Sequence, residues 1–135
     1  MKISFDSLKP AYIQIAEAIE DDIISGKLVE GEAAYSQLII ARELSVNPAT
    51  AAKGINMLVS KGILEKQRGA SMTVAFGALD RLLKERREKG FRDIISNLVS
   101  EAIKVNLSEE EVIEEIKKQF AKAPLAAPEE DKQHE

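Results

Sequence analysis

Residues 47–74 read NPATAAKGINMLVSKGILEKQRGASMTV, and this stretch decides the fold. Asn47 is a good N-cap for a helix, and Pro48 suits the first helical position. Apolar residues at helical spacing then give this helix one inward face. Gly62 marks its C-terminal end. The pattern predicts a helix over residues 47–60.

Two short strand patterns follow this helix, at residues 63–66 and 72–75. A tight turn at residues 68–71 joins them, with Arg68 at its tip. We expect an antiparallel hairpin, or wing, beside the helix. A helix that fits the major groove and an arginine-tipped wing together form a surface suited to double-stranded DNA.

The residues before this stretch supply the rest of a helix-turn-helix. Residues 10–25 carry apolar side chains at helical spacing and predict a core helix. Ser36 is a candidate cap for a second helix over residues 36–44, and a turn leads from there to Asn47. The fold class is therefore α+β, with a winged helix-turn-helix domain over residues 1–76.

The remaining chain predicts a helical appendage over residues 77–121 and a disordered acidic tail over residues 122–135. Ser108 and Glu111 form a capping box for the last helix. Two amphipathic helices cannot bury their apolar stripes alone, so they dock on a second copy or on the winged domain. We predict a homodimer, with a monomer whose helices fold back as the alternative. The candidate dimerisation residues are Leu79, Leu82, Leu83, Phe91, Ile94, Ile95, Leu98, Ile103 and Ile116.

Composition sets further bounds on the 135-residue chain. It has no cysteine, which excludes disulfides and thiolate metal sites, and no apolar run reaches the roughly 18 residues of a membrane span. We expect no cofactor, no metal, no membrane partner and a cytoplasmic location.

The formal net charge of the chain is −4, yet residues 42–76 are net positive by three. This segment holds Arg42, Lys53, Lys61, Lys66 and Arg68 against Glu43 and Glu65. Phosphate contacts need such local cations rather than a basic average.

Three segments together resemble the GntR family of bacterial repressors, and within it the short YtrA-type branch. Residues 10–28 resemble the family pattern P-x-Y-x-Q-I that ends in I-x-x-G-x-L. Residues 46–50 read VNPAT, close to the branch's V-N-P-x-T, and residues 62–74 resemble its G-x-L and R-G-x-x-x-x-V. All three occur in order at family spacing, which makes the resemblance specific.

The DNA-reading residues are predicted from the helix face and the wing. Helix-turn-helix proteins present the N-terminal part of the second helix to base edges, which places Thr50 and Lys53 near phosphates or bases. A solvated lysine and a simple turn charge are the alternatives for Lys53 and Arg68. Gly54 allows either close packing or a close approach of the DNA backbone. The candidate DNA-binding residues are Tyr35, Ser36, Gln37, Asn47, Ala49, Thr50, Lys53, Asn56, Lys66, Arg68 and Gly69.

The resemblance implies a homodimeric repressor that binds an imperfect palindrome and often controls a transporter operon, with release by a small-molecule effector. Many family members carry an arginine where this chain has Leu38. This departure and the net negative charge of the chain keep a second function open, namely a protein-interaction adaptor that has lost DNA binding. An enzyme is not expected, because the single histidine, His134, lies in the tail and no nucleophile-base set accompanies it.

Overall fold

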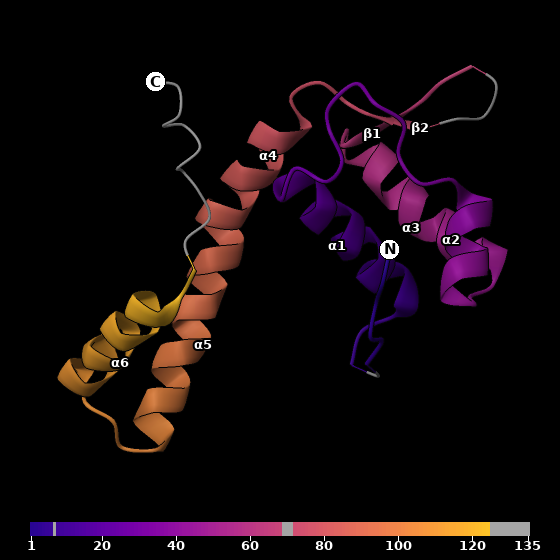
Figure 1. Cartoon of the computed structure of the whole chain (residues 1–135). Coiled ribbons are helices and arrows are strands. Elements are labelled where there is room, and N and C mark those ends of the chain that lie inside the picture. Colours follow the sequence, from indigo (N-terminus) through magenta and orange to yellow (C-terminus); the bar gives the residue numbers. More distant parts are fainter. Residues whose placement is uncertain (7, 69–71, 125–135) are drawn as a thin grey trace, which may run out of the picture. The chain divides into compact units, whose positions relative to one another are not determined.

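The computed structural model describes residues 1–6, 8–68 and 72–124 (Figure 1). The chain forms two compact units, and the first runs from Met1 to Gly90. Its elements are α1 (Ala11–Ile24), α2 (Gln37–Leu44), α3 (Pro48–Ser60), β1 (Leu64–Lys66), β2 (Met72–Val74), α4 (Ala78–Glu85) and a π-helical turn at Arg86–Gly90. The second unit begins at Phe91 and holds α5 (Phe91–Lys104) and α6 (Glu109–Lys122). The α+β winged-helix architecture predicted from the sequence is confirmed.

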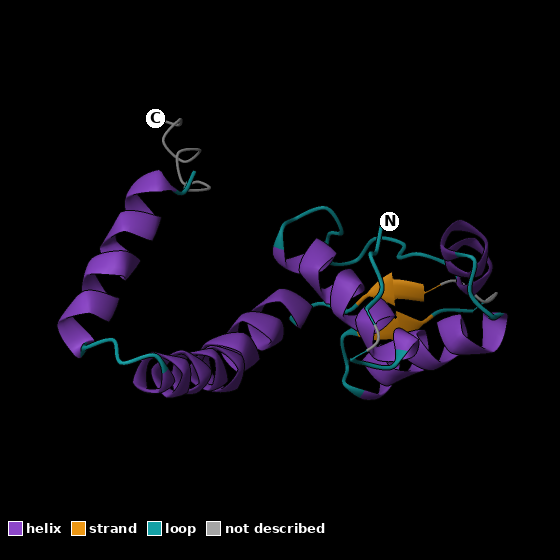
Figure 2. Ribbon diagram, turned by 90° about the horizontal axis from the view of Figure 1, so that it is seen from below, coloured by secondary structure: helices purple, strands orange, loops and turns teal. Residues whose placement is uncertain are grey.

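The first unit packs its helices and its wing around one apolar core. Helices α1 and α2 both pack on α3, and β1 pairs with β2 in an antiparallel hairpin that Figure 2 shows in orange. An extended segment beside β2 widens the wing, since the Gly31 N–H donates to the Val74 carbonyl at 2.8 Å. The fully buried side chains of the core include Ile15, Ile19, Ile23, Ile40, Leu58, Ile63, Leu64, Leu82 and Val74.

Local side-chain caps begin α2, α3 and α6 where the sequence predicts them. The Asn47 side chain accepts a hydrogen bond from the Ala49 N–H at 2.8 Å, with Pro48 in the first helical position. Ser36 accepts from the Ile39 N–H at 3.1 Å and starts α2. The capping box of Ser108 is also complete at the start of α6. Each cap satisfies an N–H that the helix itself leaves unpaired.

Helix α4 belongs to the winged unit, which therefore extends past the boundary expected after residue 76. Ala78 and Leu82 are buried in the core of that unit, and Leu79 packs against it. The Glu30 carboxylate caps the helix from a distance, accepting the N–H groups of Gly77 at 3.0 Å and Leu79 at 2.9 Å. Gly77 has a φ of +90° and no side chain, so it cannot cap α4 itself.

The Glu30 cap predicts a pH-dependent contribution to stability. The hydrogen bonds from Gly77 and Leu79 hold the pKa of Glu30 below its ordinary value of 4.5. A carboxylate with a lowered folded-state pKa stabilises the fold above the unfolded pKa, and the contribution is lost as pH falls through the folded pKa. The native chain should thus unfold at higher urea than Glu30→Gln near neutral pH, and the difference should shrink in acid. A difference that stays constant from neutral to acidic pH would contradict this cap.

A charge cluster ties α1 to the end of α3 and to the π-helical turn. Glu20 is only 6% exposed, and its carboxylate accepts from the Lys61 ammonium at 2.7 Å. Arg86 lies 3.7 Å from the same carboxylate and donates to Asp21 at 2.9 Å. Lys61 is itself exposed, so the cluster lies at the surface of the unit. Its charge neutralises Glu20 and Glu85 there.

The second unit is a helical hairpin with a long apolar surface. Among the residues predicted for dimerisation, the exposed or partly exposed members in this unit are Phe91, Ile94, Ile95, Leu98, Ile103 and Ile116. Leu83 of α4 is half-buried, whereas Leu82 is 1% exposed in the winged core and so unavailable to a partner. No helix among residues 1–6, 8–68 and 72–124 has the length and apolar character to cross a membrane.

Candidate nucleic-acid interface

Helix α3 has one face that is buried in the core and an opposite face that is exposed to solvent. Ala51, Gly54, Ile55 and Leu58 are buried against the other helices. The exposed residues Ala49, Lys53, Asn56 and Ser60 follow a spacing of three or four, which places them on one opposite stripe. Thr50 lies half-buried at its side. Ser60 is absent from the residues predicted from the sequence, although its spacing from Asn56 signals its place on this stripe.

A short turn leads from the end of α2 to the start of α3, and one side chain also connects the starts of the two helices. The Gln37 side-chain amide donates to the Pro48 carbonyl at 3.3 Å and links the two helix starts. Ser36 and Asn47 use their side-chain oxygens as caps, which leaves the hydroxyl and amide hydrogens as donors. Neutral donors of this kind suit phosphate oxygens and fix the register of a protein on a duplex.

Tyr35 is placed differently from the sequence-based expectation of a DNA contact. Its hydroxyl donates to the Asp22 carboxylate of α1 at 2.6 Å. Burial, followed by the hydrogen bond and charge of Asp22, raises the pKa of Tyr35 to about 12. The partly buried side chain therefore joins the segment before α2 to α1, and its hydroxyl proton is used in that bond.

The basic side chains of the winged unit differ in whether they are paired with carboxylates. Lys61 is exposed but ion-paired with Glu20 at 2.7 Å and Glu85 at 3.6 Å, so its charge is largely offset by these carboxylates. Lys53 is exposed on the α3 stripe, and its ammonium lies 4.3 Å from the centre of the Tyr12 ring. Arg42, Lys66 and Arg68 are exposed on α2 and the wing. Gly69, the other predicted wing contact, lies outside the described residues.

The structure shows whether Leu38 and Gly54 face solvent or the core. Leu38 is 66% exposed in the first turn of α2, so the usual family arginine is replaced by an apolar surface residue rather than a core residue. Gly54 faces the core, and a Cβ added there would lie 2.9 Å from the Tyr12 carbonyl oxygen. Of the two reasons considered for this glycine, the structure supports close packing against α1 and not an approach to DNA.

Comparison with known proteins agrees with this architecture. Residues 11–74 match the model of the family described as "Bacterial regulatory proteins, gntR family". The HTH-type transcriptional regulator YhcF of Bacillus subtilis is 30% identical over 117 residues, which cover 87% of this chain and 95% of YhcF.

Solved structures give the same result. A GntR family transcriptional regulator from Listeria monocytogenes is 27% identical, with a TM-score of 0.70 over 84% of this chain and 98% of that one. YtrA from Sulfolobus acidocaldarius, a GntR-family transcription factor, is 28% identical, with a TM-score of 0.52 over 91% of this chain and 98% of that one. The chain belongs to the GntR family of bacterial regulatory proteins and is a transcriptional regulator with a DNA-binding winged helix-turn-helix.

Proposed function

We propose that this regulator binds an imperfect palindrome as a homodimer, with one winged unit on each half-site. The observation that carries the proposal is the outward stripe of α3, where Ala49, Lys53 and Asn56 stand free of the core. Lys53 supplies a cation for a phosphate or a guanine edge, and Ala49 is suited to a thymine methyl group. The exposed cations Lys66 and Arg68 of the wing add phosphate contacts beside the same groove.

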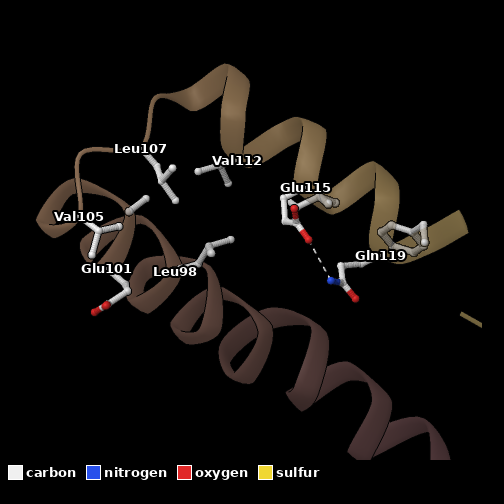
Figure 3. Close-up of a pocket in the computed structure, with 10 residues that line it drawn as sticks. Leu98, Glu101, Val105, Leu107, Val112, Glu115 and Gln119 are labelled. Carbon is white, nitrogen blue, oxygen red and sulfur yellow. Dashed lines mark hydrogen bonds between the residues drawn. The ribbon is translucent and has the colours of Figure 1, made fainter. Parts of the chain in front are cut away.

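The helical hairpin of the second unit is the proposed dimerisation surface. Between α5 and α6 lies a groove of about 300 Å³ whose accessible surface is almost wholly apolar, although Glu101, Glu115 and Gln119 also line it (Figure 3). Leu98, Val105, Leu107 and Val112 contribute to these walls, and Phe120 at the far end of α6 is 67% exposed. Exposed apolar patches of this kind are typical of protein interfaces. A second copy would cover the apolar face that one hairpin leaves open.

The regulatory output follows from the family resemblance. Repression is the expected effect, often on a transporter operon, and a small-molecule effector would release the DNA by acting on the hairpin unit or the dimer interface. The adaptor without DNA binding stays the second candidate, favoured by exposed Leu38 and by the ion pairing of Lys61 with Glu20. Salt dependence separates the two, because a phosphate-binding surface loses affinity as salt rises.

We predict that Lys53→Ala and Arg68→Ala each weaken binding to DNA. Each removes a cation from the proposed surface, so each should lower the slope of log affinity against log salt by about one unit. Fluorescence anisotropy with a labelled duplex, at several salt concentrations, measures this slope.

The matched control is Lys117→Ala, which removes an exposed lysine from α6, outside the proposed surface. This variant should keep the slope of the native chain. If neither Lys53→Ala nor Arg68→Ala changes the binding isotherms, the assignment of α3 and the wing to DNA is wrong. If the native chain itself shows no salt-dependent binding, the adaptor function replaces the regulator that reads DNA.

A further inference from the structure

Helix α1 contributes one aromatic side chain to the edge of the outward α3 stripe. The Lys53 ammonium lies 4.3 Å from the centre of the Tyr12 ring, within the range of a cation–π interaction. Tyr12 is half-buried in the first turns of α1, next to the fully buried Ile15, while Lys53 is exposed. The pair therefore joins an anchored ring to a solvent-facing cation.

The crossing of the two helices depends on Gly54, the neighbour of Lys53. A Cβ at this position would lie 2.9 Å from the Tyr12 carbonyl oxygen and 3.2 Å from the Ile15 side chain. Backbone atoms give way less readily than flexible side-chain ends, so a residue with a Cβ would push the helices apart. Glycine thus allows the close approach that brings the Tyr12 ring over the Lys53 ammonium.

We propose that Tyr12 is a positioning residue for DNA recognition, holding the Lys53 ammonium at the edge of the α3 stripe before DNA arrives. This inference rests on the proposed DNA-binding surface. A free lysine loses rotamer freedom when it binds a phosphate or a base edge. A lysine already held over a ring loses less. The ring occupies one side of the ammonium, and the remaining N–H donors are available to the duplex.

The proposal predicts coupling between two residues on different helices. Tyr12→Leu should weaken DNA binding by about two- to fivefold, the fold-change that corresponds to an exposed cation–π interaction. Tyr12→Phe keeps the ring and should bind like the native chain. Lys53→Met removes the ammonium but keeps an unbranched side chain. In a Lys53→Met background, Tyr12→Leu should have no further effect.

The experiment is a double-mutant cycle on the full chain, with a duplex selected from a random pool by the native protein. Affinities of the native chain, Tyr12→Leu, Tyr12→Phe, Lys53→Met and the double variant are measured at one fixed salt concentration, and circular dichroism checks that each is folded. Equal losses from Tyr12→Leu in both backgrounds would show that Tyr12 acts through stability and not through Lys53. Unchanged or tighter binding by Tyr12→Leu would also overturn the proposal, and tighter binding would mean that the ring withholds Lys53 from DNA.

A second measurement applies if Tyr12→Leu does not fold. The Lys53 Cε protons of the native chain should resonate upfield because of the ring current, both free and bound to the duplex. Ordinary lysine shifts in the bound state would contradict the proposal. Failure of the proposed DNA surface has a different signature, since Lys53→Met would then bind like the native chain.

Discussion

Ending the chain after Gly90 should leave a folded monomer whose affinity for a two-half-site duplex is lower by about 10²–10⁴-fold. The first compact unit ends at this residue and contains α3 and the wing. Its core therefore survives the cut, whereas the exposed apolar faces of α5 and α6 are lost. Without them each winged unit binds alone, and the second half-site is no longer reached at a high effective concentration.

The control for this truncation is a chain that ends after Pro124 and keeps both helices of the hairpin. It should retain the mass and the affinity of the full chain, because the removed residues carry mainly alanine, proline and charges. Sedimentation at tens of micromolar gives the mass, and anisotropy gives the affinity. A full chain that sediments as a monomer, or a residue 1–90 fragment that binds as tightly as the full chain, would contradict the dimer.

Leu82→Ala should destabilise the winged unit by about 2–5 kcal/mol. Leu82 is 1% exposed in the core that α4 forms with the rest of the winged unit, so truncating its side chain deletes buried contacts and leaves a cavity. Urea unfolding of the residue 1–90 fragment measures the loss. Leu83→Ala is the matched control, since this neighbour on the same helix is half-buried and should cost clearly less. Equal, small losses for both would place α4 outside the core.

The boundary between the two compact units could not be predicted from the sequence. Apolar residues recur with one helical period from Leu79 to Ile103, and nothing local separates those that enter the core from those that do not. The decisive partner of α4 is Glu30, whose carboxylate caps a helix start nearly fifty residues later in the chain. A cut after Phe76, the domain boundary expected from the sequence, would remove Ala78 and Leu82 from the core.

The starts of α2, α3 and α6 were predictable because their signals are local. Ser36, Asn47 and Ser108 each bind an N–H two or three residues further along, so the residue type and its neighbours suffice. The inward and outward faces of α3 follow from spacing for the same reason.

The roles of Tyr35 and Lys61 were not predictable in this way. Their partners, Asp22 and Glu20, lie on α1 and meet them only through the tertiary fold. A residue type that suits DNA also suits an ion pair or hydrogen bond within the protein, so composition alone overestimates the number of cations without a carboxylate partner. Lys53 lies between these cases, since its place on the stripe follows from spacing but its contact with Tyr12 does not.

Selection of bound duplexes from a random pool by the full chain tests most directly whether this regulator reads DNA as a symmetric pair. We expect enrichment of two inverted half-sites whose centres are about one helical turn, roughly 34 Å, apart. The Lys53→Ala variant should recover the same sequence more weakly, if its contact is to phosphate. A pool that shows no enrichment, or that converges on a single half-site without an inverted partner, would contradict the binding of two half-sites by a homodimer.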